Sequence, residues 1–269
     1  MKYIIIAAAA ALILAVYLAC ENLLMLRIRR ERLGSGVRIM HISDLHKRRF
    51  GKDNRRITAA VKAEKPDLIF LTGDIVSRNE TNFDAAEKLI QEMCAVSDVY
   101  FIYGNHEQSF ITPDRAVRFA EMLSRTDVRL LRNSSISTEI NGRHFSIYGL
   151  ELPYSAYKKN GSYRHLDRIT AKDVSYALGE APQGEVLLLA HNPLFGREYA
   201  EWGADFTFSG HIHGGSVRMF GIGMLSPERT LFPRYSKGVY DFGGKKLLVS
   251  GGLGKLRAFN PPEIVIYEI

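Results

Sequence analysis

Residues 3–19 form a long apolar run, and shorter apolar runs alternate with polar stretches from there to the C-terminus. The first run reads YIIIAAAAALILAVYLA without a charge, and apolar residues resume at Leu23–Leu26. A bilayer crossing takes about 20 mostly apolar residues, so the run predicts an uncleaved, single-pass transmembrane helix. The alternative is lipoprotein processing at Cys20, but Tyr17 stands where such sites usually carry Leu, and the apolar run continues beyond Cys20.

After residue 36, apolar runs of strand length alternate with helical periodicity, which is the pattern of an α/β fold. We expect strands at Val37–Ile42, Leu68–Thr72, Val99–Tyr103, Phe145–Leu150, Val186–Ala190, Phe206–Ser209, Lys246–Ser250 and Ile264–Tyr267. We expect helices at Arg55–Lys65, Ala85–Ala95, Asp114–Ser124 and Thr170–Leu178. Residues 153–168 and 216–238 are the least regular and are expected to form long loops.

The same pattern divides the chain into two parts. Residues 1–33 are expected to form the membrane anchor and a juxtamembrane segment, and residues 34–269 a single catalytic domain. Gly34–Gly36 would serve as the flexible joint between them.

Composition limits the chemistry that this domain can perform. The chain has two cysteines, so neither a disulfide framework nor a thiolate metal cluster can be built, and any metal must be held by nitrogen and oxygen. The formal net charge of +7 favours anionic partners, which include phosphates, nucleic acid and an acidic membrane surface.

Five of the apolar runs end in a polar cluster that contains metal-ligand residue types. The clusters are HISDLH at 41–46, TGD at 72–74, GNHE at 104–107, AHNP at 190–193 and SGHIHGG at 209–215. Loops beyond the carboxyl ends of strands meet at one crevice in open α/β sheets, so these clusters are expected to converge. The spacing of two within Asp44/His46 and within His211/His213 directs both members of each pair to one side of an extended chain.

Each cluster alone has an ordinary structural explanation, such as a surface pair, a turn or a hydrogen-bonded core histidine. Their recurrence at five strand ends favours a shared metal centre. Glycines that flank the clusters permit sharp turns and close approach to a ligand, as at Gly73, Gly104 and Gly210.

The ordered clusters resemble the calcineurin-like metallophosphoesterase family, whose pattern is D-x-H, GD, GNH, a single His and GHxH. The resemblance covers about residues 37–269, and FPRYSKGVY and FNPPEI look like the secreted or membrane-anchored bacterial branch. It implies a four-layer α/β/β/α sandwich in which two sheets pack together. It assigns Asp44, His46 and His213 to one metal, Asn105, His191 and His211 to the other, and Asp74 as the bridge.

Two cations about 3.5–4 Å apart would neutralise a phosphate ester, orient it and lower the pKa of a bridging water to generate hydroxide. The imidazole, carboxylate and amide donors suit Mn, Fe or Zn better than Ca. The resemblance makes His106 the residue that protonates the leaving oxygen or stabilises the transition state; its structural alternative is a supporting hydrogen bond. Ser77, Ser216 and Gly251 depart from residues common in the family, and none is an expected ligand.

The expected function is therefore a two-metal hydrolase of phosphodiesters or phosphomonoesters on envelope or lipid-linked substrates. The alternatives are a UDP-diacylglucosamine-type pyrophosphate hydrolase, a nuclease, which the anchor does not favour, and a non-catalytic binding module on the same fold. One long loop offers either a cradle for a sugar or nucleotide or only a solvated basic surface. Its candidate residues are Tyr154, Tyr157, Lys158, Lys159, Tyr163 and Arg164.

Signals for membrane topology conflict. Lys2 precedes the apolar helix, whereas Arg27, Arg29, Arg30 and Arg32 follow it, which by charge alone places the body in the cytoplasm. Exported relatives of the branch that the chain resembles act outside the cytoplasm. We expect a cell-membrane protein with an extracytoplasmic catalytic domain, whose arginines lie against lipid head groups.

Overall fold

Two six-stranded sheets face each other in the structure, a computed structural model that describes residues 1–163 and 165–269. The first sheet has the order β1 (Arg27–Arg32), β14 (Glu263–Glu268), β2 (Arg38–Ile42), β3 (Leu68–Leu71), β4 (Asp98–Phe101) and β5 (Arg129–Leu130). The second has the order β12 (Gly238–Phe242), β13 (Lys245–Val249), β9 (Phe206–Ser209), β8 (Glu185–Ala190), β7 (Arg143–Leu150) and β6 (Ser134–Ile140). A separate hairpin consists of β10 (Val217–Met219) and β11 (Ile222–Leu225).

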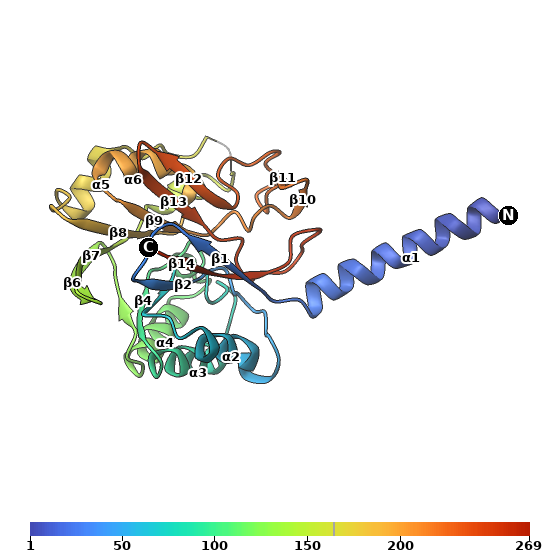
Figure 1. The fold of residues 1–269 in the computed structure, drawn as a ribbon, viewed down its shortest axis with the longest axis horizontal. Coiled ribbons are helices and arrows are strands. Elements are labelled where there is room, and N and C mark those ends of the chain that lie inside the picture. Colours follow the sequence, from blue (N-terminus) through green and yellow to red (C-terminus); the bar gives the residue numbers. More distant parts are fainter. Residues whose placement is uncertain (164) are drawn as a thin grey trace.

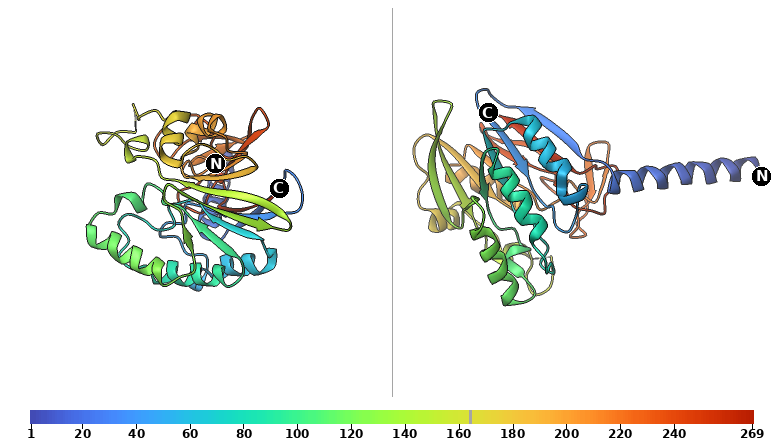
Figure 2. Two further views of the ribbon diagram at one scale, coloured as in Figure 1. Left: turned by 90° about the vertical axis from the view of Figure 1, so that its left-hand side faces the viewer. Right: turned by 90° about the horizontal axis from the view of Figure 1, so that it is seen from below.

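Helices cover the outer faces of both sheets (Figures 1 and 2). Helices α2 (Arg55–Glu64), α3 (Asp84–Cys94) and α4 (Pro113–Ser124) lie on the first sheet, and α5 (Ala171–Leu178) and α6 (Gly196–Trp202) lie on the second. Short 3-10 helices occupy Lys52–Asn54, Glu107–Ser109, Tyr154–Ala156 and Pro193–Phe195. The expected four-layer α/β/β/α sandwich is confirmed.

Apolar side chains between the sheets hold the layers together. Phe70, Tyr100 and Phe208 are fully buried there, and their rings pack edge to face. Strands covered on both faces read as continuous apolar runs, as in LIFL of β3 and VLLLA of β8. For this reason the eight predicted strands and four predicted helices are present, with ends that move by two residues at most.

The sequence pattern missed the strands β1, β5, β6, β10, β11 and β12 and the helix α6. Most are short or lie at a sheet edge, where the apolar signal is weak. Strand β6 reads SSISTEI with alternating exposed and half-buried positions, and β5 has only two residues.

Strand β1 corrects the expected juxtamembrane segment. Residues Arg27–Arg32 pair in parallel with Glu263–Glu268, so this stretch belongs to the first sheet. Three of its arginines form ion pairs within the domain, Arg29 with the buried Glu263, Arg30 with Glu64 and Arg32 with Glu268. Arg27 instead lines a surface cavity. The expected joint at Gly34–Gly36 is an exposed bend that is hydrogen-bonded to the body, because Gly34 N–H donates to the carbonyl of Glu268 and the carbonyl of Gly36 accepts from Asn141.

Helix α1 (Lys2–Leu23) projects away from the body along most of its length (Figure 1). Its length and apolar composition fit a membrane span, and a signal sequence shares both properties. Within the helix Glu21 is buried, because the last turn contacts the body.

Candidate metal centre

The predicted donors follow the carboxyl ends of five parallel strands. Asp44 and His46 follow β2, Asp74 follows β3, Asn105 and His106 follow β4, His191 follows β8, and His211 and His213 follow β9. The first sheet supplies β2, β3 and β4, and the second supplies β8 and β9. The loops that follow these strands meet at one edge of the sandwich. The structure therefore brings together every side chain expected in the site.

Several of these residues have left-handed backbone conformations. The φ angles are 55° at Asp44, 52° at His46, 55° at Asp74, 69° at His211 and 55° at His213. Such conformations in residues with a Cβ cost about 1–3 kcal/mol each and persist only where surrounding contacts impose them. Several of them lie in the donor loops, which indicates that contacts of the donor side chains compensate for the backbone strain.

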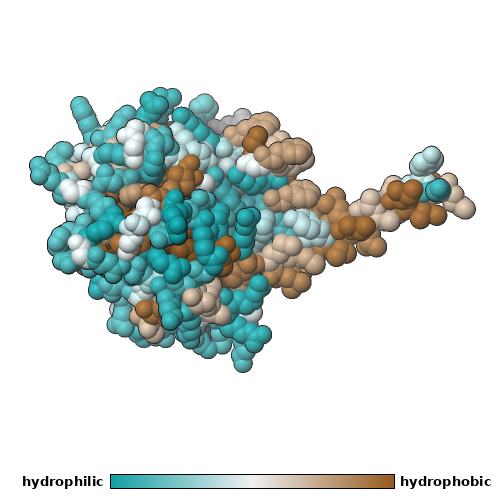
Figure 3. Space-filling view, in the orientation of Figure 1, coloured by the Kyte–Doolittle hydropathy of each residue, from teal (hydrophilic) through white to brown (hydrophobic). Residues whose placement is uncertain are grey.

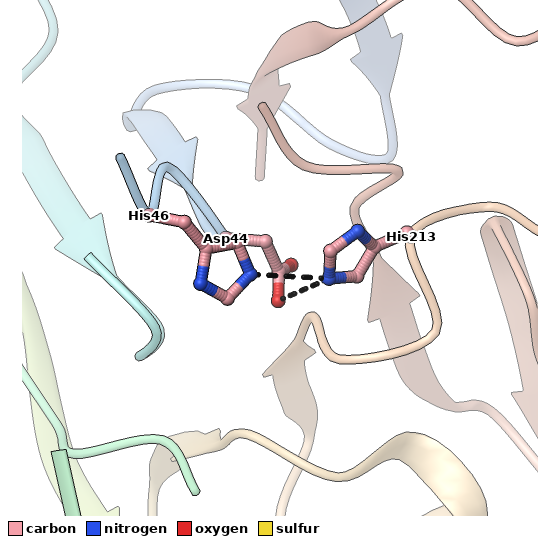
Figure 4. Close-up of side chains that lie close together, drawn as sticks. All are labelled: Asp44, His46 and His213. Carbon is pink, nitrogen blue, oxygen red and sulfur yellow. Dashed lines mark hydrogen bonds and ion pairs between the residues drawn. The ribbon is translucent and has the colours of Figure 1, made fainter. Parts of the chain in front are cut away.

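The first group of donors contains Asp44, His46 and His213 (Figure 4). The Nε2 atom of His213 lies 3.4 Å from Oδ1 of Asp44 and 3.4 Å from Nε2 of His46. The Asp44 carboxylate is fully buried and also accepts the backbone N–H of His211 at 3.2 Å. Carboxylate and imidazole atoms thus face one point.

The second group contains Asp74, His191 and His211. The Nδ1 atom of His191 lies 2.6 Å from the carbonyl oxygen of Thr72, and its Nε2 lies 3.4 Å from Oδ2 of Asp74. Asp74 is within reach of both groups, because the same Oδ2 is 3.9 Å from Nε2 of His46. This position suits a carboxylate that bridges two ions.

Two buried donor atoms at this position, Oδ1 of Asn105 and Nε2 of His191, have no hydrogen-bond partner among the described residues. Nε2 of His211 also forms no regular hydrogen bond, but it lies 2.8 Å from Oε1 of Glu228. A buried polar atom without a partner costs free energy, so these atoms fit a centre that is completed by cations. The nitrogen and oxygen donors match borderline divalent transition metals.

Electrostatics supports the same fit. Burial alone would raise the pKa of Asp44 and Asp74, but neighbouring histidines outweigh it and lower both, so both carboxyl groups are ionised. Burial would likewise lower the pKa of His191, but Asp74 and Asp44 raise it to about 9. The buried carboxylates thus favour positive charge at this position, which a bound cation would supply.

Two glycines are required by close packing around the carboxylates. A Cβ at Gly104 would lie 2.3 Å from Oδ1 of Asp74, and one at Gly210 would lie 1.9 Å from Oγ of Ser43. These distances are shorter than any real contact, so a side chain at either position would displace the donor loops.

His106 forms a third group of possible ligand atoms with His46 and Asp74, although the family pattern assigns it no metal. Its backbone N–H donates to Oδ1 of Asp74 at 2.8 Å, and its Nε2 lies 3.9 Å from Oδ2 of the same residue. Its Nδ1 accepts the backbone N–H of Arg78 at 3.3 Å. Burial lowers the pKa of His106, against the opposing effect of Asp74, so its ring is neutral near pH 7.

Two acidic residues add contacts that the sequence did not predict. Glu107 accepts the backbone N–H groups of Asp74, Val76 and Gly104 and so joins the loops after β3 and β4. Glu228 comes from the long loop after β11, and its Oε1 lies 2.8 Å from Nε2 of His211. The GNHE motif already contained Glu107, whereas nothing near Glu228 in the sequence indicates the site.

A groove of about 500 Å³ leads from the centre to the surface. His46, His106 and His213 lie at its inner end, together with Ser77 and Ser216, two of the departures from the family pattern. The rest of its lining combines basic and apolar side chains, of which Leu45 and Arg48 are buried. These are Leu45, Lys47, Arg48, Leu225, Pro227, Arg229, Lys255 and Leu256.

The candidate cradle loop contributes mainly through its tyrosines. The Tyr157 ring is buried 5.0 Å from the ring of His211, and Tyr163 lines the small cavity at the centre. Lys159 instead pairs with Asp167 at the surface. Arg164 lies outside the described residues.

Comparison with known proteins agrees with this geometry. The family described as "Calcineurin-like phosphoesterase" matches residues 37–215. An uncharacterized metallophosphoesterase of Aquifex aeolicus is 28% identical over 88% of this chain and 86% of its own length. Phosphodiesterase YaeI of Escherichia coli is 25% identical over 86% and 82%. UDP-2,3-diacylglucosamine pyrophosphatase LpxG of Chlamydia muridarum is 25% identical over 86% and 83%.

The matched segment spans most of the chain and contains every strand-end loop that carries a predicted donor. Proteins of this family use two divalent metal ions, and the donor set described above suits them. The chain belongs to the calcineurin-like phosphoesterases and is a metal-dependent hydrolase of phosphate esters.

Proposed function

We propose that the chain is a membrane-anchored two-metal phosphoesterase that acts on amphiphilic, lipid-linked phosphodiesters or pyrophosphates of the cell envelope. The observation that carries this proposal is the groove beside the metal centre, which places basic and apolar side chains next to one another. Lys47, Arg229 and Lys255 suit an anionic head group, and Leu225 and Leu256 suit an apolar portion. Nucleotide or sugar phosphates that carry no lipid would use only the basic side chains of the groove and would leave its apolar side chains without a role.

The metal centre would use the seven side chains that the sequence identified. Asp44, His46 and His213 would hold one ion, Asn105, His191 and His211 the other, and Asp74 both. Bound divalent ions would supply Lewis-acid activation of water and neutralise the phosphate charge. Mn, Fe and Zn all suit these donors.

His106 is proposed to act directly on the substrate. Its Nδ1 accepts from Arg78, so the proton of the neutral ring resides on Nε2, the atom that faces the centre. A hydrogen bond from this atom would stabilise charge that develops on the phosphoryl or leaving oxygen. Burial lowers the pKa of His106, so a neutral ring that donates a hydrogen bond fits the site better than a protonated ring that acts as an acid.

Metal analysis and turnover of the full-length protein in detergent test the function. We expect about two metal ions per chain, and chelation should abolish hydrolysis of bis(p-nitrophenyl) phosphate until Mn²⁺ restores it. Asp74→Asn should lower metal content and turnover, whereas the surface variant Asp241→Asn should change neither. Full activity in verified metal-free protein would refute the two-metal mechanism.

The same assays separate the remaining alternatives. A chain that binds two ions but hydrolyses neither soluble nor lipid-linked phosphate esters would be a binding module. A nuclease would cleave single-stranded DNA or RNA faster than lipid-linked pyrophosphates. The proposal expects the opposite preference.

A further inference from the structure

The base of α1 is fixed to the body by buried hydrogen bonds. The Glu21 carboxylate is fully buried and accepts the backbone N–H groups of Phe259 and Asn260. Asn22 donates to the carbonyl of Arg257 at 2.7 Å and accepts its N–H at 2.9 Å. The helix therefore has a defined orientation relative to the catalytic domain.

The loop that receives α1 also supports the metal centre. The Nδ2 atom of Asn260 donates to the carbonyl oxygens of His213 and Gly215, each at 2.7 Å. Arg257 donates to the same His213 carbonyl at 3.0 Å. A single loop thus connects the end of the apolar helix to a predicted metal ligand.

The length of α1 determines how deep this loop would lie in a membrane. A hydrocarbon core of about 30 Å takes about 20 helical residues, so a core that begins at Tyr3 ends near Asn22. The ring of Phe259 stacks on Tyr17, with ring centroids 5.7 Å apart. Tyr17 is five residues before Asn22, so Phe259 would lie about 7.5 Å inside that boundary.

The neighbouring surface is apolar enough for such a position. Phe220, at the tip of the β10–β11 hairpin, is 95% exposed, and Leu256 is 85% exposed. Other exposed apolar residues lie in the hairpin, in the loop that follows it and in residues 255–261. They are Met219, Ile222, Leu231, Phe232 and Phe259. Figures 1 and 3 show the hairpin on the side from which α1 projects, and apolar surface that continues from the helix onto the body. Large exposed apolar patches mark interaction or membrane sites.

Basic side chains accompany these apolar ones. A cavity of about 430 Å³ is lined by Arg27 and Arg218 together with Phe220 and Phe259. Lys237 also lines it, but its ammonium group pairs with the buried Glu263 at 2.6 Å. Basic residues beside interfacial aromatic residues suit the anionic head groups of a bilayer. A surface for an apolar protein partner would not need the positive charge of Arg27 and Arg218.

We propose that the β10–β11 hairpin, the loop that follows it and residues 255–261 form a second membrane contact in the leaflet beside the base of α1. The groove of the metal centre, which Arg229, Lys255 and Leu256 line, then opens at the lipid head groups. The substrate enters from the bilayer, and its phosphate reaches the centre without leaving the membrane surface. This inference rests on the proposed anchor and specifies how a lipid-linked substrate would arrive.

Tryptophan fluorescence in vesicles of phosphatidylcholine and phosphatidylglycerol with brominated acyl chains tests the contact on the full-length protein. The chain has one tryptophan, Trp202, which is buried on α6 and should not be quenched. Phe220→Trp and Phe232→Trp should each add emission that the brominated lipids quench. Tyr176→Trp is the matched control, because Tyr176 is also 95% exposed but lies on α5.

Leu12→Trp in the middle of α1 reports on the anchor alone. Quenching at positions 12, 220 and 232, with none at 176, is the expected result. Quenching at position 12 without quenching at positions 220 and 232 would overturn the second membrane contact. In that case, cross-links between the hairpins of two chains would assign the apolar patch to contact with a second copy of the chain. An absence of quenching at 12 would refute the anchor itself. None of these signals requires bound metal or turnover, so their failure is distinct from failure of the phosphoesterase function.

Discussion

At the residue scale, the centre depends on hydrogen bonds that fix the orientation of each donor ring and carboxylate. Thr72 directs Nε2 of His191 toward Asp74, and Arg78 directs Nε2 of His106 toward the same carboxylate. Glu107 joins two of the donor loops through three backbone N–H groups. Such supports reduce the reorganisation needed when ions and substrate bind.

His106→Ala is expected to lower turnover by about 10²–10⁴-fold, because it removes a positioned donor beside the reacting phosphate. Metal content should stay at the wild-type value, since the assigned ligands are intact. His106→Gln restores an N–H donor and should recover part of the lost turnover. Steady-state kinetics on alkyl and aryl phosphodiesters, with metal analysis of each variant, provides the measurement. Unchanged turnover on the alkyl ester, or loss of an ion, would contradict the proposed role.

At the element scale, β1 and α1 have different relations to the domain. Strand β1 provides an edge of the first sheet, and its Arg29 pairs with Glu263, which is fully buried and also pairs with Lys237. Among the described residues, the contacts of α1 with the body lie in its last turns. We therefore propose that the soluble unit begins before β1, near Met25, rather than after residue 33.

Two truncations distinguish these boundaries. Deletion of residues 1–24 should leave the sheet complete, whereas deletion of residues 1–33 removes β1 and the guanidinium beside Glu263. Glu263 keeps its ion pair with Lys237, so the lost contact is one hydrogen bond to a charged group. Such a bond contributes about 1.5–3 kcal/mol, which corresponds to a Tm about 3 °C or more lower in a domain of this size. Thermal unfolding followed by circular dichroism compares the two proteins. Equal transition midpoints would show that β1 is dispensable.

At the scale of the whole molecule, the loop that receives the base of α1 also contacts the metal centre, so a membrane-spanning α1 would hold the centre near one face of the bilayer. The arginines after α1 favour a cytoplasmic body during insertion. In the folded protein Arg29, Arg30 and Arg32 each pair with a carboxylate, at Glu263, Glu64 and Glu268. They therefore do not require an anionic cytoplasmic leaflet, and we retain the extracytoplasmic side.

Protease treatment of intact bacterial spheroplasts that express the full-length protein tests this topology. An extracytoplasmic domain should be digested from outside, as detected with an antibody against the C-terminus. A cytoplasmic protein expressed in the same cells serves as the control for membrane integrity. Protection of the domain until lysis would show that the charge bias determines orientation and that the substrate is cytoplasmic.

The sequence by itself identified the buried strands, the amphipathic helices and the candidate donor residues. Strands such as LIFL and VLLLA are apolar throughout because both faces are covered, so local composition alone identifies them. Donors that directly follow such strands converge because the carboxyl ends of parallel strands share one edge. The calcineurin-like motif could therefore be recognised, and the four-layer fold anticipated, without coordinates.

Tertiary structure alone decided the contacts that join segments distant in the chain. Three such contacts are the parallel pairing of β1 with β14, the burial of Glu21 against residues 259–260 and the approach of Glu228 to His211. The local sequence around each residue does not indicate which distant residue it will contact. The polar strand Arg27–Arg32 forms because β14 offers an unpaired edge, and its own apolar content would not predict it. Local propensity is weak in such segments, so long-range pairing and burial determine their structure.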